Sequence, residues 1–571
     1  MQTKKDLTGY PSIDKPWLKY YSEEAINAPL PECTMYEYIY NQNKDNLKRV
    51  AMNYYGANIT YDKMFEQISK MAGILEIEGI QEGEVVTICM GNAPDTVCLL
   101  FALNKIGAVA NMVYGGSTPE ELKKYVVDVK STMVFTIDMF QDKFKAIADE
   151  VKLKKVIVTN LTESMSLMNR MGARLLKKMQ PLPLPTDTRF CSWKQFFRNA
   201  HKGSHTCHDA NAPAIITYTG GTTGGSKGAI LSNKAVNAVA HQVFLRGDIS
   251  RDDIWMQVLP LFIAYGATSS MMIALAVGMT QIIRIPMIES IAELCQKFKP
   301  NYIIYGPAYW EKFADDNADL ELSGLKIPTS GGDMLRPAVE EKINKYLKQH
   351  GCHDPIMSGY GMTEVGAAVS TSFSPHAHRL GSVGVPFVKS IISVFDSETG
   401  KELQYGQEGE ICIQTPSMML GYVNNQEETD NIIRQHDDGK LWVHSGDLGY
   451  IDEDGFIFVS GRLKRFFLHI ENGIHKKIFS LDIEKVFLQH PKVDNCVVIP
   501  KNDENTHQVP VAYVILKEEY RSETGIETKL QTYAEKHLTE DYRPIKYIFR
   551  DKFPLTKIGK VDYRALEKEV E

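Results

Sequence analysis

A glycine- and hydroxyl-rich run directly after an apolar segment most limits what this chain can fold into. Ala214 to Tyr218 (AIITY) has the composition of a buried strand, and residues 219–228 (TGGTTGGSKG) follow it. Glycines let the backbone turn its N–H groups toward an anion, the hydroxyls add donors, and a lysine adds positive charge. We therefore expect a phosphate-binding loop made of Thr219, Gly220, Gly221, Thr222, Thr223, Gly224, Gly225, Ser226 and Lys227.

Two other interpretations of this loop are less favoured. The nucleoside-triphosphatase loop places Ser or Thr directly after Gly-Lys to bind magnesium, whereas Lys227 lies between Ser226 and Gly228. A flexible Gly/Ser/Thr linker would not need an apolar strand leading into it.

Apolar segments alternate with helical patterns through most of the 571 residues. Glu84 to Met90 (EVVTICM) reads as a strand and is followed by a helical pattern over Val97 to Ile106. Tyr302 to Tyr305 reads as another strand, followed by a polar helix and a glycine-rich turn at Ser330 to Asp333. This alternation predicts an α/β protein with parallel sheets, and the length allows about four folding units.

Composition excludes several classes of function. With 64 Lys and Arg against 71 Asp and Glu, the chain lacks the basic surface that unspecific nucleic-acid binding needs. Nine cysteines without a Cys-x-x-Cys pair, and a polar N-terminus, predict a cytoplasmic protein. The most apolar stretches, Val97 to Val113 and Ser269 to Ile285, are interrupted by polar residues and are expected to be buried rather than membrane-spanning.

The stretch Met165 to Met179 leaves two interpretations open. Its apolar residues recur at near-helical spacing beside Arg170, Arg174, Lys177 and Lys178. Such a helix can lie on an anionic membrane, although a surface helix that covers the edge of a core is commoner.

A second group of residues raises the question of a metal. His201, His205, Cys207 and His208 offer nitrogen and sulfur ligands within a polar segment. Their spacing matches no standard zinc pattern. We expect loop residues here rather than a metal site.

Further motifs before and after the phosphate loop show which family pattern the loop belongs to. In chain order they are Asn92-Ala-Pro94, Gly107-Ala-Val109, Ser117 to Leu122 (STPEEL), Pro260-Leu-Phe262 with Tyr265-Gly266, Gly331-Gly-Asp333, Gly359 to Glu364 (GYGMTE), Gly409-Glu410, Gly421-Tyr422, His444 to Tyr450 (HSGDLGY), Gly461 to Lys464 (GRLK), and Pro554 to Thr556 with Gly559-Lys560 and Asp562. In this order, and over nearly its whole length, the chain resembles the adenylate-forming superfamily of acyl- and aryl-CoA synthetases, amino-acid adenylation domains and luciferases.

The resemblance implies a fold and a division into domains. It implies a large N-terminal AMP-binding domain over residues 1–460, made of stacked α/β subdomains with a β-barrel-like subdomain. A small, mobile α+β domain over residues 461–571 would carry the catalytic lysine, with Lys464 at the hinge. Residues 466–484 are slightly longer than the family pattern. The C-terminal part has a charge of +2 and the rest −9, which suits the phosphates of CoA.

The resemblance also assigns roles to individual residues. Lys560, Thr219 and Glu364 would be catalytic: Lys560 at the α-phosphate of ATP, Glu364 as a ligand of Mg²⁺. Tyr360 would stack on adenine, and Asp447 would accept hydrogen bonds from the ribose hydroxyls. The other nucleotide-binding residues outside the phosphate loop would be Gly332, Asp333, Gly361, Thr363 and Arg462. Phe262, Tyr265 and Gly359 would line the substrate pocket.

The residues that follow the motif Pro260-Leu-Phe262 indicate which kind of carboxylic acid the protein binds. Residues 262–270 contain no acidic side chain, and an unpaired buried ammonium would be costly. An acid without an α-amino group is therefore expected. Ile263 stands where many CoA-ligase relatives carry histidine, which favours a fatty or other apolar acid.

Four functional hypotheses follow, of which an ATP-dependent acyl-CoA synthetase leads. A nearer alternative passes the acyl group to a carrier-protein thiol. A non-catalytic nucleotide-binding protein is disfavoured because Lys560, Glu364 and Asp447 are all present. A phosphotransferase is disfavoured because the loop lacks Gly-Lys-Ser/Thr.

Overall fold

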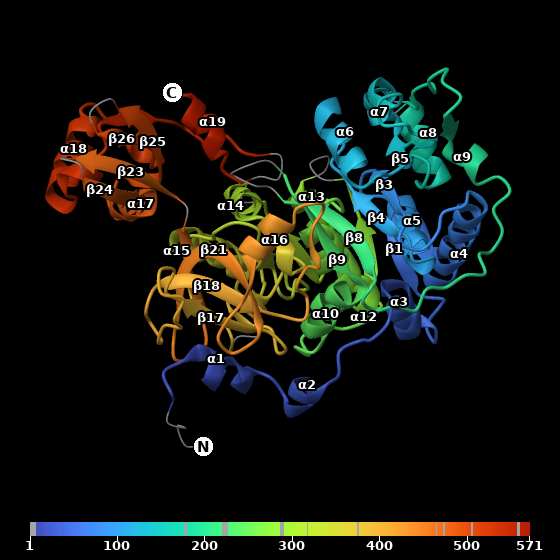
Figure 1. Ribbon diagram of the computed structural model, residues 1–571, viewed down its shortest axis with the longest axis horizontal. Coiled ribbons are helices and arrows are strands. Elements are labelled where there is room, and N and C mark those ends of the chain that lie inside the picture. The colour runs from blue at the N-terminus through green and yellow to red at the C-terminus, as the bar shows by residue number, and fades with distance from the viewer. Residues whose placement is uncertain are drawn as a thin grey trace.

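The computed structural model describes residues 7–175, 180–219, 226–285, 290–316, 318–373, 376–463, 465–471, 474–503, 506–556 and 560–570. Within these ranges the strands form four sheets, and helices pack around them (Figure 1). The predicted hinge residue Lys464 and the loop residues Gly220 to Gly225 lie outside the described residues.

An eight-stranded sheet contains the strand that leads into the phosphate loop. The strands from β4 to β7 pair in parallel, whereas β9 pairs antiparallel with both β8 and β19. Its order is β19 (Gly421–Tyr422), β9 (Gly228–Ser232), β8 (Pro213–Tyr218), β4 (Val109–Met112), β3 (Val85–Cys89), β5 (Met133–Ile137), β6 (Lys155–Thr159) and β7 (Phe190–Ser192).

A nine-stranded sheet forms the second layer and is parallel from β1 to β14. Its order is β16 (Val385–Pro386), β15 (Ser370–Thr371), β14 (Met357–Tyr360), β13 (Thr329–Ser330), β12 (Tyr302–Tyr305), β10 (Ile254–Gln257), β11 (Thr280–Ile283), β1 (Val50–Tyr54) and β2 (Ala57–Thr60).

Helices join the two large sheets into one body. One hydrophobic core contains side chains from both sheets and from α3, α4, α5, α10 and α12. Local sequence sets several helix starts: Thr118 and Glu121 form a capping box at the start of α6, where Pro119 is the first helical residue. The main helices are α3 (Met35–Asn43), α4 (Tyr61–Ile77), α5 (Pro94–Lys105), α6 (Pro119–Asp128), α7 (Gln141–Ile147), α8 (Leu167–Leu175), α10 (Asn233–Phe244), α12 (Ile273–Val277), α13 (Ile291–Phe298), α14 (Pro307–Asp315), α15 (Pro337–Gln349), α16 (Gln426–Ile432), α17 (Ser480–Leu488), α18 (Ile526–His537) and α19 (Tyr563–Lys568).

Two smaller five-stranded sheets complete the described chain. The first is antiparallel and packs one face on a core that includes Val365 and Val369. It contains β17 (Ile391–Phe395), β18 (Gly409–Gln414), β21 (Leu441–Ile451), β20 (Ile433–Gln435) and β22 (Ile457–Arg462). The second, with its own core, contains β24 (Ile474–Phe479), β23 (Phe466–Glu471), β26 (His507–Leu516), β25 (Val493–Asp503) and β27 (Lys546–Phe549).

The C-terminal sheet stands apart from the body and touches it at few points (Figure 1). Lys485 lies 3.5 Å from Glu408, and Arg336 donates to the carbonyl of Asp494. At Gly461 the φ angle is +154°, and a Cβ atom would lie 1.9 Å from Leu481. Glycine is therefore required where the chain leaves the body.

The predicted fold class is confirmed: α/β layers with a small antiparallel sheet, followed by a smaller α+β unit. The strands predicted over Glu84 to Met90, Ala214 to Tyr218 and Tyr302 to Tyr305 are β3, β8 and β12. The predicted helix at Met165 to Met179 is described as α8 up to Leu175. None of the helices in the described residues is long and apolar enough to cross a membrane.

Candidate functional site

The phosphate loop connects β8 to β9, as a hairpin closed at its base. The N–H of Thr219 donates to the carbonyl of Lys227 (2.9 Å), and the N–H of Lys227 donates to Thr219 Oγ1 (3.2 Å). Ser226 Oγ donates to the carbonyl of Thr219 (2.7 Å). These bonds fix the two ends of the loop whose glycines were predicted to surround phosphates.

Tyr422 on β19 joins the phosphate loop to Glu364. The Lys227 ammonium lies 5.0 Å above the ring of Tyr422 and pairs with Glu428 on α16. The hydroxyl of Tyr422 donates to Glu364 Oε1 (2.5 Å). Burial and the neighbouring Glu364 carboxylate raise the pKa of Tyr422, so Tyr422 stays a donor and holds one oxygen of the predicted metal ligand.

Three predicted nucleotide ligands meet beside the small antiparallel sheet. Asp447 on β21 and Arg462 on β22 are register partners, and Arg462 Nε lies 2.8 Å from Asp447 Oδ1. The hydroxyl of Tyr360, at the end of β14, donates to Asp447 Oδ2 (2.7 Å). Burial raises the pKa of Asp447, and the charge of Arg462 opposes that rise. The paired arginine and the tyrosine hydroxyl thus keep a buried carboxylate oriented.

Lys560 reaches this cluster from the C-terminal unit. The described residues on its two sides are paired: the N–H of Thr556 donates to the carbonyl of Lys560 (2.6 Å), and Leu555 forms a bridge with Val561. Burial lowers the pKa of Lys560, while the charges of Asp333, Asp447 and Glu364 oppose that shift. The charges of three carboxylates of the body therefore act on a lysine of the C-terminal unit.

The turn after β13 approaches Tyr265 closely. A Cβ atom on Gly331 would lie 2.3 Å from the hydroxyl oxygen of Tyr265, whereas Gly332 has φ +88° and open space beside it. Asp333 is exposed next to it, and its Oδ1 accepts from the N–H of Met334. The motif Gly331-Gly-Asp333 thus lets Tyr265 reach the turn and presents Asp333 toward solvent.

We expect Gly331→Ala to lower the free energy of unfolding by about 1–3 kcal/mol, because the added methyl group overlaps the Tyr265 hydroxyl. Tyr265→Phe in the same chain should recover part of this loss, because it removes the closest atom. Chemical denaturation of the single and double variants measures both effects. Equal losses in Gly331→Ala with and without Tyr265→Phe would contradict the contact.

The motif from Gly359 to Glu364 also depends on small residues. A Cβ on Gly361 would lie 1.9 Å from the carbonyl oxygen of Ala367, and one on Gly359 would lie 3.3 Å from that of Ser370. Thr363 begins a short 3₁₀ turn that contains Glu364. These contacts hold the chain in a sharp reversal that places Tyr360 and Glu364 at the site.

The predicted acid-binding segment follows β10 and is fixed by Asn92. The side chain of Asn92 donates to the carbonyl of Leu259 (2.9 Å) and accepts from the N–H of Leu261 (3.0 Å). Phe262 then packs on Tyr114, with ring centroids 4.7 Å apart. This contact orients the apolar face of the segment that leads to Tyr265.

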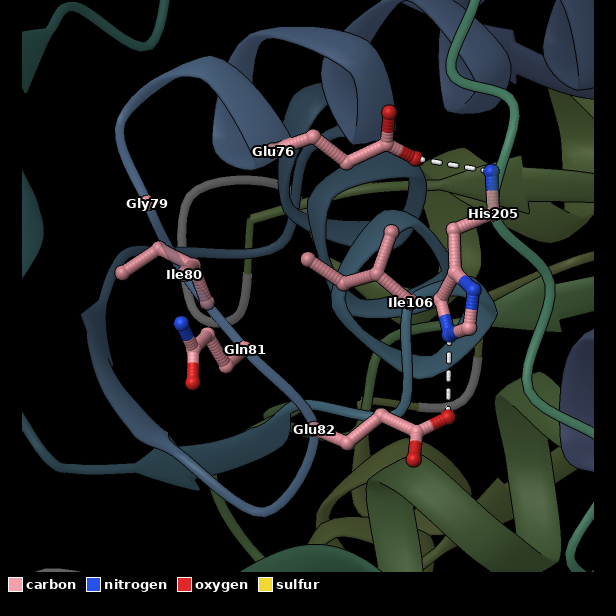
Figure 2. A pocket seen from close by; sticks show the side chains of 7 residues that line it. All are labelled: Glu76, Gly79, Ile80, Gln81, Glu82, Ile106 and His205. Atoms are coloured by element: carbon pink, nitrogen blue, oxygen red, sulfur yellow. Dashed lines mark hydrogen bonds and ion pairs between the residues drawn. The ribbon is translucent and has the colours of Figure 1, made fainter.

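The histidines and cysteine considered for a metal are dispersed. His205 lies 2.9 Å from Glu82, and His208 pairs with Glu37 instead. Figure 2 shows His205 at the rim of a hollow of about 330 Å³ beside the end of α4, lined also by Glu76 and Ile106. The hollow contains none of the predicted nucleotide ligands.

Sequence reasoning missed several residues that hold the site together. Tyr422 belongs to the motif Gly421-Tyr422, but the sequence alone assigns it no function in the site. Glu428, which pairs with Lys227, carries no sequence signal. Ser445 Oγ accepts from the N–H of Asp447 (3.0 Å), and Glu410 accepts from the N–H of Gly446 (3.0 Å); both lie within quoted motifs, which was the available signal.

Comparison with known proteins gives the family. The AMP-binding enzyme model matches residues 39–423, and the AMP-binding enzyme C-terminal domain model matches residues 482–560. A long-chain-fatty-acid–CoA ligase of Bacillus subtilis is 25% identical over 98% of both chains. A 4-coumarate–CoA ligase of Humulus lupulus is 27% identical over 90% of this chain and 89% of its own.

Solved structures share the fold. The anthranilate CoA ligase AuaEII in complex with anthranoyl-AMP matches with a TM-score of 0.78, at 20% identity, over 96% of this chain and 99% of its own. ATP-bound MatB from Rhodopseudomonas palustris matches with a TM-score of 0.77, at 22% identity, over 94% and 98%. The first family model alone spans more than half of the chain. The chain therefore belongs to the AMP-binding enzyme family.

Proposed function

We propose that this protein joins an apolar carboxylic acid, such as a fatty acid, to CoA in two steps. ATP and the acid first give an acyl-adenylate and pyrophosphate, and CoA then gives the acyl thioester and AMP. The observation that carries the proposal is the cluster in which Tyr360 and Arg462 hold the Asp447 carboxylate, with Lys560 near enough for the charges of Asp333, Asp447 and Glu364 to raise its pKa against the effect of burial. It brings a cation to the place where the matched motifs position the nucleotide.

In the first step a carboxylate oxygen attacks the α-phosphorus of ATP, and the bond to pyrophosphate breaks. Two anions approach each other, so catalysis needs positive charge and hydrogen-bond donors. Lys560 supplies the charge, and the loop from Thr219 to Lys227 supplies donors to the β- and γ-phosphates. Lys227 must exchange its contact with Glu428 for phosphate as the nucleotide enters.

The donor set fits Mg²⁺ as a partner of ATP. Glu364 is a buried carboxylate with one oxygen held by Tyr422, and the phosphate groups of ATP would add further oxygens. A set made only of oxygens suits this hard cation. When bound, Mg²⁺ would neutralise phosphate charge; Glu364 would hold it in place.

The adenosine contacts follow from the second cluster. The Asp447 carboxylate can accept two ribose hydroxyls, because each of its oxygens has a further lone pair beyond the one that Tyr360 or Arg462 uses. Tyr360 would stack on adenine, and Gly332 leaves open space for the purine beside Asp333. Arg462 would bind ribose or phosphate.

The second step needs the thiol to attack the carbonyl carbon of the adenylate, with AMP leaving. We propose that the unit from residue 461 to 571 moves about Lys464 between the two steps and that residues 1–460 form the other domain. The few contacts of the C-terminal sheet with the body, such as Lys485 with Glu408, would allow this movement.

The acid should be apolar and lack an α-amino group. Residues 262–270 carry no acidic side chain, and Phe262, Ile263 and Tyr265 present aromatic and aliphatic groups there. A charged substrate amine would have no partner in this segment. The B. subtilis and H. lupulus relatives are named for a fatty acid and for coumarate.

The acceptor is tested together with the acid. Purified enzyme, ATP and Mg²⁺ are incubated with fatty acids of graded length and with aromatic acids, each with CoA or with a phosphopantetheine carrier protein. We expect AMP, pyrophosphate and acyl-CoA from an apolar acid. Thioester on the carrier alone would replace CoA by a carrier protein, and ADP as product would reject the ligase altogether.

A peripheral contact with anionic membranes is the second part of the proposal. On α8 the side chains of Leu167, Met168, Met171 and Leu175 are 76%, 79%, 63% and 80% exposed. They therefore do not cover a core edge, unlike the buried Met165. Residues 164–186 contain four basic and no acidic residues, which suits an anionic lipid surface.

Flotation with vesicles of anionic and of zwitterionic lipid tests this contact. We expect the wild type to float with anionic vesicles and a variant with Leu167, Met168, Met171 and Leu175 changed to Gln to stay in solution. Leu441→Gln with Ile545→Gln removes exposed apolar residues elsewhere and serves as control. Unchanged flotation of the α8 variant would reject the contact.

A further inference from the structure

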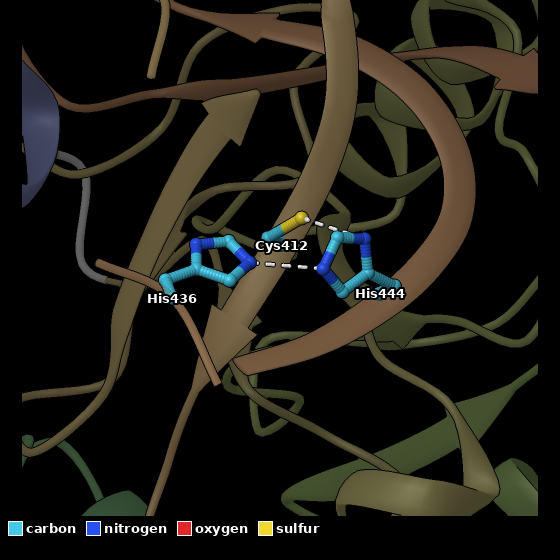
Figure 3. Close-up of side chains that lie close together, drawn as sticks. All are labelled: Cys412, His436 and His444. Carbon is cyan, nitrogen blue, oxygen red and sulfur yellow. Dashed lines mark hydrogen bonds between the residues drawn. The ribbon is translucent and has the colours of Figure 1, made fainter. Parts of the chain in front are cut away.

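Two histidines and a cysteine converge on one face of the small antiparallel sheet (Figure 3). Cys412 on β18 and His444 on β21 are direct register partners. His436 follows β20, whose pairing with β21 places it on the same face as His444. One ligand atom from each of the three residues lies within 4.8 Å of the others. The register of three adjacent strands thus brings the three side chains together.

The two imidazoles face each other through the same kind of nitrogen. His436 Nε2 lies 2.9 Å from His444 Nε2, and Cys412 Sγ lies 3.6 Å from His444 Nδ1. Glu410 Oε2 lies 2.8 Å from His444 Nδ1. A carboxylate that holds one ring nitrogen fixes the tautomer and turns the other nitrogen's lone pair outward, which is the usual arrangement around a metal-bound histidine.

Aromatic rings lie beside the cluster. Phe395 and Trp442 flank His436, with ring centroids 4.5 and 5.6 Å away, and Cys412 is buried. His436 Nδ1 has no hydrogen-bond partner among the described residues.

A hydrogen-bonded histidine pair is the simpler account of the two rings, but it gives the thiol no role. Imidazole and thiolate together are ligands that Zn²⁺ prefers. Ligand atoms on one zinc ion stand roughly 3.3–3.6 Å apart. The two Nε2 atoms would therefore separate by about half an ångström, and the Cys412 Sγ, which lies beside His444 Nδ1, would turn toward His444 Nε2.

We propose that Cys412, His436 and His444 bind one Zn²⁺ ion, with Glu410 orienting His444. The ion would lock β20 and β21 against β18. His444 precedes Asp447 by three residues on β21, and Glu410 also binds the N–H of Gly446 between them. The site would therefore steady the strand that carries the ribose contact. With three protein ligands, the ion would take a water molecule as its fourth ligand, and none of the three residues belongs to the nucleotide cluster.

Metal analysis of the full-length protein, dialysed against equimolar Zn²⁺ and then against metal-free buffer, tests the proposal. We expect about one zinc per chain in the wild type and near zero in Cys412→Ser combined with His436→Gln. Cys33→Ser combined with His205→Gln is the matched control and should keep the zinc. Replacement by Co²⁺ should give a thiolate-to-cobalt absorption band in the wild type that Cys412→Ser alone removes.

Two results would overturn the site: a wild type that retains no zinc, or a Cys412 and His436 variant that retains as much as the control. Thermal unfolding separates loss of metal from loss of fold. The variant should melt as the zinc-free wild type does, whereas only the wild type and the control should gain stability when Zn²⁺ is added. Added Zn²⁺ stabilising the Cys412 and His436 variant equally would count against the proposal.

Discussion

Replacing Lys560 by alanine is expected to lower the rate of adenylate formation by about 10²–10³-fold while sparing thioester formation from supplied acyl-adenylate. Lys560 is partly buried, within reach of the charges of Asp333, Asp447 and Glu364. Its ammonium can neutralise charge as the carboxylate attacks the α-phosphate. The second step begins from an adenylate that is already formed and needs no such neutralisation.

Pyrophosphate release measures the first step, and thioester formation from synthetic acyl-adenylate and CoA measures the second. Lys552→Ala removes an exposed lysine of the same unit and should leave both rates unchanged. Equal loss of both steps in Lys560→Ala would contradict the assigned role. If Lys560→Ala kept the rate of adenylate formation, another residue would have to supply the catalytic positive charge.

The pH dependence of the first step should carry the signature of this lysine. Burial lowers the pKa of Lys560, so the ammonium deprotonates at a lower pH than the value of about 10.4 for a free lysine. Adenylation therefore falls as pH rises through the lowered pKa. A pH profile of the first step checks this, and Lys560→Arg should shift the fall to higher pH because arginine stays protonated.

Local sequence predicted the elements that carry the site better than the contacts that join them. Apolar runs such as Ala214 to Tyr218 became buried strands because a strand buried on both faces needs a continuous apolar run. The bend at Gly331 could likewise be expected from its glycines. The partner that requires it, Tyr265, lies 66 residues earlier and is brought there by the order of β10, β12 and β13.

Long-range strand pairing explains why the sequence did not predict two other sets of contacts. Glu428 reaches Lys227 because β19 adds to the edge of β9 and places α16 beside the loop. His436 meets His444 and Cys412 through the register of three strands. No spacing along the chain encodes these contacts, whereas the histidines that did stand close in sequence, His205 and His208, pair with separate carboxylates.

Asp447→Ala should have the second largest effect, a fall of about 10²-fold in kcat/KM for ATP. The carboxylate would hold two ribose hydroxyls, and hydrogen bonds to a charged group contribute about 1.5–3 kcal/mol each. Asp551→Ala removes an exposed carboxylate of the C-terminal unit and should leave kcat/KM unchanged. Steady-state kinetics with ATP as the varied substrate measures both variants.

Tyr360→Phe tests whether the Tyr360 hydroxyl acts on the nucleotide only by orienting the Asp447 carboxylate. The tyrosine hydroxyl donates to Asp447 at 2.7 Å, so its loss should cost about tenfold in kcat/KM, because one hydrogen bond to a charged group is removed. If Tyr360 acts through Asp447, adding Tyr360→Phe to Asp447→Ala should change kcat/KM little further. Additive losses would mean that the two side chains serve the nucleotide independently, and Asp447 would then owe its orientation to Arg462 alone.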